Sequence, residues 1–431
     1  MCTASQRNGG TRCCMPSTPG FLWAVLLFRL QPAAECSLIA GRTVEDHLLI
    51  LQRNEGETCE PFTAVADSPV VVVGMGGSGT RSMEMMLEAA GVNTGTKLLQ
   101  NGKPRDLALF LPPLNTKKKN RWFHNLGVQH KISRYHMDVD VMHSLNITLR
   151  ESYHAQVGII EKVLEGAHRK NLGTLSWQME DLDLETQRQL ITAGAVLKSV
   201  LQFAARTSIC GGDYVQWGWK APRNLFLLPF IKWMFPRARF IHVVRTPFDF
   251  PQHSRRKEAK DGKACGHLGQ ASAWLALAPA LLENVHYTEH DEPGKCTPQV
   301  ILRHAQYGSR MWSNATVAAS RWGSRLAPEN YMDVRIDLDL VLASREDALA
   351  VCKKILRFVS IPDTEEIAGR MISHISGKSN HSTSYSKHRF QTEAVIDELL
   401  KPWLTKELAA AVQHFKYPVP HHLQSQYDAL L

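Results

Sequence analysis

A glycine-rich loop close to residue 75 combines residue types that can bind a phosphate. The apolar run Val70–Val73 predicts a buried strand, the segment 74–79 is rich in glycine, and a helix is predicted from Thr80 onward. Small residues let backbone N–H groups approach an anion, and the helix dipole adds partial positive charge. ATP-binding loops need Gly-Lys-Ser/Thr, whereas Gly79 is followed here by Thr80 and Arg81. The loop therefore indicates a phosphate-bearing ligand other than ATP; the alternative is a tight turn that binds nothing.

An arginine ends a second predicted strand. The run 238–244 is of the buried type, Arg245 follows it, and Pro247 then breaks the strand. Parallel sheets bind ligands at the carboxyl ends of their strands. The guanidinium fork of arginine fits a phosphate group. Arg245 is therefore a candidate phosphate ligand, with Ser254 a short way further along the chain.

Four segments in this order resemble sulfotransferases that use 3′-phosphoadenosine 5′-phosphosulfate (PAPS), and their pattern is most similar to the bacterial-type members. They are the segments 76–82, 217–230, 235–254 and 331–340, within a likeness that spans roughly residues 68–417. The resemblance implies a three-layer α/β P-loop fold with a central parallel sheet and a helix-rich C-terminal half. It assigns the 3′-phosphate to Arg245 and Ser254, and the 5′-phosphosulfate to Gly76, Gly77, Ser78, Gly79, Thr80, Arg81 and Ser82.

A basic loop near the C-terminus also resembles one that family members close over the 3′-phosphate. Its candidates are Lys387 and Arg389. The alternative for this segment is a solvated, charged loop with no ligand.

The sequence departs from the family pattern at two points. Gly77 stands where most members carry a lysine or arginine that contacts the bridging oxygen, and Ser254 lies one residue further from Arg245 than in most members. Sulfuryl transfer needs positive charge on the departing phosphate. Lys220, at the end of a predicted strand, and Arg81, in the first helical turn, are the candidate replacements. The alternatives are a solvated lysine and a surface arginine.

The resemblance also implies a histidine or carboxylate that takes the proton of the acceptor hydroxyl. Asp106 lies in a stretch that resembles a substrate-facing segment of the bacterial-type members, and His124 is the second candidate. Geometry decides between such groups. His242 lies within a buried strand, so we predict a structural role for it.

The composition fits an enzyme that binds anions. The 431 residues have a formal net charge of +9 at pH 7, and 44% of them are hydrophobic. Positive charge suits an anionic donor. Basic residues are dispersed and no zinc-finger or RNA-binding signature occurs, so nucleic-acid binding is not predicted. The nine cysteines include no Cys-x-x-Cys pair, so no metal site is predicted, and a disulfide could join Cys265 to Cys296.

The N-terminal residues differ from the rest of the chain. Residues 1–35 are predicted to be a signal peptide or a short membrane-anchor-like leader, because the apolar run Gly20–Phe28 is shorter than the roughly 20 residues that span a bilayer. Residues 36–67 are predicted as a stem and 68–431 as the sulfotransferase domain. Sequons at Asn146, Asn314 and Asn380 favour the secretory pathway, most of all the Golgi. The cytoplasm is the alternative.

Helical periodicity dominates the rest of the chain. It predicts helices over 182–208, 266–285, 302–322, 348–359, 365–376 and 405–415, and a strand over 214–219.

These features together predict a sulfotransferase that moves a sulfuryl group from PAPS to an acceptor hydroxyl or amine, with a glycan as the favoured acceptor, PAP as product and no metal. One alternative is a P-loop kinase, against which the missing lysine argues. The other is a non-catalytic protein that binds PAP or another anion, which Gly77 would favour.

Overall fold

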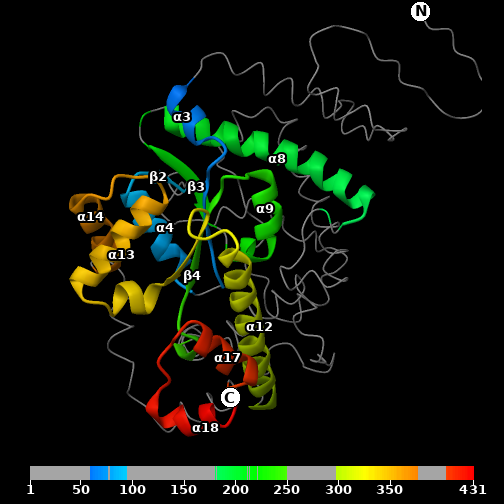
Figure 1. Cartoon of the computed structure of the whole chain (residues 1–431), viewed down its shortest axis with the longest axis vertical. Coiled ribbons are helices and arrows are strands. Elements are labelled where there is room, and N and C mark those ends of the chain that lie inside the picture. The colour runs from blue at the N-terminus through cyan, green and yellow to red at the C-terminus, as the bar shows by residue number, and fades with distance from the viewer. Residues whose placement is uncertain are drawn as a thin grey trace, which may run out of the picture.

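The computed structural model describes residues 59–75, 78–94, 180, 182–210, 212, 214–220, 222–249, 298–376 and 404–431. The centre of this part of the chain is a parallel sheet of five strands in the order β2-β3-β1-β4-β5 (Figure 1). The strands are β1 (Val70–Val73), β2 (Val92–Asn93), β3 (Gln216–Lys220), β4 (Arg239–Val244) and β5 (Tyr331–Arg335). The predicted parallel α/β sheet is confirmed.

The order of the strands places β1 in the middle of the sheet. Strands β2 and β3 lie on one side of β1, and the chain then crosses to the other side, where β4 and β5 lie. In the register of β1 and β4, Val73 pairs with His242, so the two strands end side by side. Open parallel sheets bind ligands at such a reversal of strand order, outside the carboxyl ends of the strands. The glycine loop and Arg245 follow these two strand ends.

One face of the sheet packs on a helical layer built from α4 (Thr80–Ala89), α13 (Arg345–Phe358) and α14 (Glu365–Ser376) (Figure 1). Side chains alternate along a strand, and Val70 and Val72 of β1 belong to this cluster. Both are fully buried, as expected for a strand covered on both faces. Ser344 caps the start of α13 by accepting a hydrogen bond from the Asp347 N–H.

The opposite face packs on α8 (Leu184–Cys210), α9 (Leu228–Met234), α12 (Pro298–Ser324) and α17 (Lys406–His414). Val71 and Val73 of β1 belong to this second cluster. Trp217, Trp219 and Phe235 contact one another within it, with ring centroids 5.7 to 5.9 Å apart. The two clusters and the sheet between them make the three layers that the sequence predicts.

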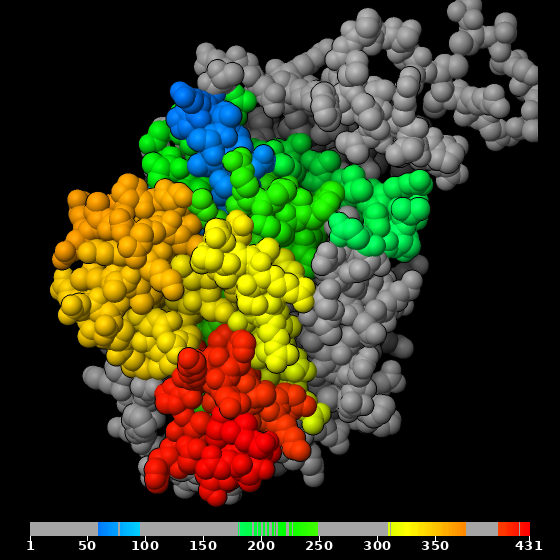
Figure 2. All heavy atoms as spheres, in the orientation of Figure 1, coloured from blue at the N-terminus to red at the C-terminus, as the bar shows by residue number. Residues whose placement is uncertain are grey.

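Five short elements complete the described structure. They are η4 (Pro222–Leu227), η5 (Pro247–Asp249), the π-helical turn η7 (Ile336–Val341), η8 (His421–Leu423) and α18 (Gln424–Asp428). The C-terminal helices, red in Figure 2, lie against α12, in yellow. None of the helices in the described ranges combines the length and hydropathy that a membrane span requires.

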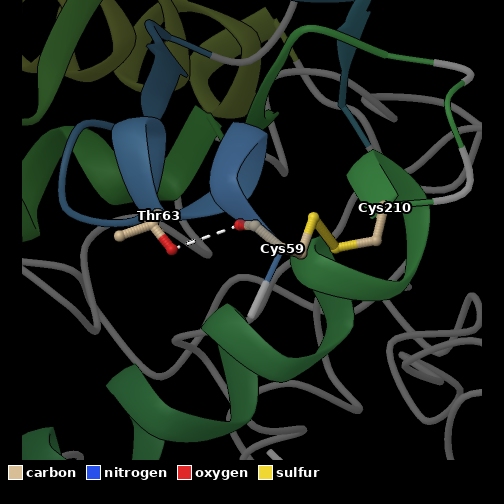
Figure 3. The surroundings of a disulfide bond; sticks show 3 residues. All are labelled: Cys59, Thr63 and Cys210. Atoms are coloured by element: carbon tan, nitrogen blue, oxygen red, sulfur yellow. Dashed lines mark hydrogen bonds between the residues drawn. A yellow bond between two sulfur atoms is a disulfide. The ribbon is translucent and has the colours of Figure 1, made fainter. Parts of the chain in front are cut away.

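The last part of the predicted stem contacts the residues that follow it. Helix α3 (Glu60–Val65) lies in this part, and a disulfide joins Cys59 at its start to Cys210 at the end of α8 (Figure 3). The Trp217 indole also donates a hydrogen bond of 2.9 Å to the Val65 carbonyl, and Phe62 is buried in the second cluster. The part of the predicted stem from Cys59 onward therefore packs on the structure that follows it, and the boundary at residue 68 stays a prediction.

The predicted helices in the described ranges are present, most of them with ends shifted by a few residues; 365–376 matches α14 without a shift. The helix predicted over 302–322 is α12 (Pro298–Ser324), and 405–415 corresponds to α17 (Lys406–His414). The predicted helix 266–285 and the Cys265–Cys296 disulfide lie outside the described residues. The two-residue strand β2 has too short a pattern to be predicted.

Candidate active site

The glycine loop follows β1 and has no room for side chains at its start. Gly74 has φ +154°, and a Cβ at this position would lie 2.5 Å from the Val243 carbonyl oxygen and 2.7 Å from Ser78 Oγ. The loop backbone therefore lies directly against the end of β4. The Ser78 hydroxyl is buried and has no hydrogen-bond partner among the described residues. A buried polar atom of this kind costs free energy unless a ligand or water satisfies it.

Helix α4 begins at the end of this loop. Gly79 is its N-cap in the left-handed region, at φ +98°, and a Cβ there would lie 3.0 Å from the Ile336 side chain. Glycine is favoured in this backbone conformation. The first N–H groups of a helix have no intrahelical acceptor and carry partial positive charge. The N-terminus of α4 can therefore bind an anion beside Ser78.

The structure brings five of the seven predicted loop residues together at this helix start: Ser78, Gly79, Thr80, Arg81 and Ser82. Gly76 and Gly77 lie outside the described residues. Thr80 is buried, whereas Arg81 is exposed.

The end of β4 is held in place by a buried carboxylate. The Thr246 N–H, next to Arg245, donates a 2.8 Å hydrogen bond to Asp337 Oδ2 in η7. The other oxygen of Asp337 accepts a 3.2 Å hydrogen bond from the Tyr417 hydroxyl, and only 1% of Asp337 is exposed. Burial is the main cause that raises the pKa of Tyr417 well above its usual value, and the nearby Asp337 charge is the second. This hydroxyl therefore stays protonated. Asp337 thereby connects the C-terminal segment to the strand end that carries Arg245.

A buried ion pair lies between β3 and α4. Lys220 Nζ is 3.5 Å from Glu84 Oε2, and both side chains are at most 2% exposed. Burial raises the pKa of Glu84 to about 7, although the Lys220 ammonium acts in the opposite direction. Burial likewise lowers the pKa of Lys220, and the Glu84 carboxylate opposes this shift. The alternative of a solvated lysine at the strand end is wrong.

His242 is fully buried, as predicted for a histidine within the strand. Its Nδ1 lies 2.7 Å from Asp333 Oδ1 and 2.8 Å from the Tyr331 hydroxyl. Ser320 donates a 2.6 Å hydrogen bond to the other oxygen of Asp333. Burial would raise the pKa of Asp333, but its hydrogen bonds hold that pKa below the usual value. This network joins β4, β5 and α12 below the candidate site.

Five further predicted site residues lie outside the described residues: Asp106, His124, Ser254, Lys387 and Arg389. Their roles remain predictions. Within the described ranges, no group of three or more His, Cys, Asp and Glu side chains could hold a metal ion.

A family comparison decides the class of this site. The family described as "Sulfotransferase family" matches residues 69–284, which is half of the chain. The matched segment contains the glycine loop, α4, Lys220 and Arg245. The chain belongs to the sulfotransferase family. The resemblance inferred from its motifs is thereby confirmed.

Comparison with solved structures finds sulfotransferases at low identity. Sulfotransferase STF9 from Mycobacterium avium is 13% identical, with a TM-score of 0.37 over 88% of this chain and 83% of that one. The sulfotransferase domain of the Synechococcus PCC 7002 olefin synthase is 14% identical, with a TM-score of 0.36 over 82% of this chain and 95% of that one. Sulfotransferase STF1 from Mycobacterium tuberculosis H37Rv is 13% identical, with a TM-score of 0.34 over 82% of this chain and 81% of that one. No curated protein matches significantly.

Sequence reasoning missed two buried acids at this site. Glu84 lies inside the helix predicted after the loop, and the sequence analysis assigns it no role in the site. Asp337 follows the last strand, in the segment 331–340 that resembles the family, and the sequence analysis assigns it no role in the site. A signal was present for Glu84, because it falls on the face of α4 that also carries the apolar Met83 and Leu87.

Proposed function

We propose that this member of the sulfotransferase family transfers a sulfuryl group from PAPS to an acceptor hydroxyl or amine. The observation that carries the proposal is the cradle between β1 and α4. It combines a buried Ser78 hydroxyl that has no hydrogen-bond partner among the described residues with a loop backbone that lies against the end of β4 at Gly74. These features fit a phosphate or sulfate group that approaches the backbone closely.

Residues at the two strand ends would bind different groups of the donor. Ser78, Thr80 and the first N–H groups of α4 would hold the 5′-phosphosulfate, and Arg245 would hold the 3′-phosphate. PAPS supplies an activated sulfuryl group on a phosphosulfate anhydride. The register that pairs Val73 with His242 supports this division, because it brings the ends of β1 and β4 next to each other.

Positive charge near the departing phosphate would come from Lys220 or Arg81. Lys220 is buried beside the first turns of α4, where a charge acts more strongly than in water. Arg81 is exposed at the start of the same helix and can turn toward the loop. Asp106 and His124 remain the proposed proton acceptors for the attacking hydroxyl.

A glycan is the proposed acceptor class, and the secretory pathway, most of all the Golgi, is the proposed location. The Cys59–Cys210 disulfide supports this location, because disulfides form and persist in oxidising compartments. Association with a membrane through residues 1–35 belongs to the same proposal. The sequon at Asn314 adds no support, since it lies inside α12 and its Thr316 is buried. Those at Asn146 and Asn380 lie outside the described residues.

Transfer of labelled sulfate tests the proposal. The full-length protein is incubated with PAPS labelled in its sulfuryl group and a panel of glycans, tyrosine peptides, lipids and small phenols. We expect label in a glycan fraction, and we expect Lys220→Met to lose transfer while it still binds PAP. Binding of PAP with no transfer to any acceptor would instead support the non-catalytic protein. Transfer of phosphate from ATP would support the kinase.

A further inference from the structure

The Glu84–Lys220 pair has an unusual position for two opposite charges. Lys220 is the last residue of β3, and Glu84 lies four residues into α4. At a rise of 1.5 Å per residue, Glu84 is about 6 Å along the axis from the helix start that would bind the donor. Their charged atoms are 3.5 Å apart, and Glu84 is fully buried. A carboxylate thus lies immediately behind an anion-binding helix N-terminus.

Packing alone does not account for this pair. Burying two charges costs several kcal/mol per ion, and an apolar pair of similar volume is often no less stable. The contact is also long, and neither Glu84 oxygen has a hydrogen bond of normal geometry among the described residues. An ionised Glu84 would moreover repel the donor that the neighbouring helix start attracts.

Few other charges reach Glu84. On α4 itself, Glu88 raises and Arg81 lowers its pKa, and Lys220 on β3 lowers it. The other elements packed on this face bring apolar side chains: β1 is built of valines, β2 begins with Val92, and the buried residues of α14 are Ala368, Met371 and Ile375. Burial has the largest effect on the pKa of Lys220, and among the nearby charges the Glu84 carboxylate has the largest effect.

We propose that Glu84 is a positioning residue of the donor site that holds the Lys220 ammonium beside the first turn of α4 and cancels its charge until the donor binds. When an anionic donor engages Lys220, a Glu84 that is still ionised takes up one proton from solvent and becomes a neutral acid. The pair then changes from neutral to a net charge of +1 next to the donor. This inference rests on the proposed function, because it requires PAP or PAPS to bind at α4.

Proton linkage follows from this arrangement. The approaching anion disfavours the ionised form of Glu84 and raises its pKa further in the complex. The complex then holds more protons than the free protein, so affinity falls as pH rises. With a pKa of about 7 in the free protein, the contribution of Glu84 weakens PAP binding by up to about tenfold between pH 6 and pH 8.

Isothermal titration calorimetry of the full-length protein with PAP measures this linkage. Titrations at pH 7 in two buffers with different ionisation enthalpies give the number of protons taken up. PAP itself has two phosphate groups that titrate near pH 6, so the informative quantity is the difference between wild type and Glu84→Gln. We expect wild type to take up more protons than Glu84→Gln when PAP binds, and the difference should be a fraction of one proton per site. We also expect Glu84→Gln to bind PAP more tightly than wild type at pH 8.

Glu88→Gln is the matched control, because it removes the same charge one turn further along α4. It should behave like wild type in both measurements. Equal proton uptake by wild type and Glu84→Gln, or weaker PAP binding by Glu84→Gln at pH 8, overturns the inference and leaves the donor site standing. No PAP binding by wild type at any pH overturns the proposed function and this inference together.

A second variant covers the case in which Glu84→Gln does not fold, since it leaves Lys220 buried without its partner. The double variant Glu84→Gln with Lys220→Met carries no charge at either position, and a thermal melt shows whether it folds. We expect it to bind PAP at least tenfold more weakly than wild type, without the extra proton uptake. The inference would be overturned if the double variant bound PAP as tightly as wild type and took up the same number of protons on binding.

Discussion

Replacing both Cys59 and Cys210 by serine is expected to lower the free energy of unfolding by up to about 5 kcal/mol. The two cysteines are 151 positions apart in the sequence. A cross-link stabilises a protein mainly because it restricts the unfolded chain, and the loss of that restriction grows with the logarithm of the loop length. A loop of this size lies near the upper end of the usual range.

The expected change in melting temperature follows from this free energy. Unfolding entropy of about 2.1 cal/mol/K per residue, over the roughly 370 residues from Cys59 onward, gives a shift of about 6 °C. The variant should still fold, because α3 keeps other contacts with the domain. Lys198 Nζ lies 2.7 Å from Asp67 Oδ1, and the Trp217 indole bonds to Val65.

Differential scanning calorimetry of wild type and the double serine variant, each with and without dithiothreitol, measures the effect. Reductant should lower the melting temperature of wild type toward that of the variant, and any response left in the variant belongs to other cysteines. Alkylation of the native protein should leave Cys352 unlabelled, because burial raises the pKa of its thiol to about 12. The reasoning would be refuted if wild type and the double serine variant had the same melting temperature, if reductant did not change that of wild type, and if Cys59 and Cys210 were recovered as free thiols.

Three further predictions concern stability. Gly218→Ala should destabilise the protein by more than 2 kcal/mol, because its Cβ would lie 1.8 Å from the Val70 carbonyl oxygen. Gly369→Ala, with nothing within 4 Å of its Cβ, should instead stabilise it by about 0.5–1 kcal/mol; equal effects of the two substitutions in urea unfolding would contradict this contrast. Asp337→Asn should cost about 1–3 kcal/mol and weaken PAP binding, because it disturbs the acceptor that holds the end of β4; unchanged urea midpoint and PAP affinity would speak against it. Glu84 has a pKa raised from 4.5 to about 7, so its contribution is most favourable below pH 4.5 and is lost as pH rises through 7; wild-type stability should therefore fall relative to Glu84→Gln across this window, and parallel curves would contradict the prediction.

The sheet and its central loop could be predicted because their signals are local. Four consecutive valines followed by a glycine-rich segment leave few alternatives to a buried strand and a tight turn. The same holds for Arg245, since its position after a buried strand places it at the carboxyl edge of a parallel sheet, where such sheets commonly bind ligands. The two-residue strand β2 has no such signal, and its pairing with β3 depends on the rest of the fold.

The interactions that set the chemistry of the site depend on how distant elements meet. Lys220 could be placed at the end of a strand from sequence, but its burial follows from the packing of β3 against α4, which puts Glu84 beside it. The role of Asp337 depends on the meeting of β4, η7 and the segment after α17. The pairing of Cys59 with Cys210 likewise requires α3 to dock on α8, and cysteine spacing carries no such information.

The most direct test of the donor site is the thermal stability of the full-length protein with PAP, ATP and GTP, each with and without Mg²⁺. A ligand that binds only the native state stabilises it by about 2.7 kcal/mol at 100 times its Kd, which corresponds to about 3 °C here. We predict that PAP raises the melting temperature without Mg²⁺ and that Arg245→Ala abolishes this shift. A shift with ATP and Mg²⁺ but none with PAP would contradict the sulfotransferase donor site and favour a kinase.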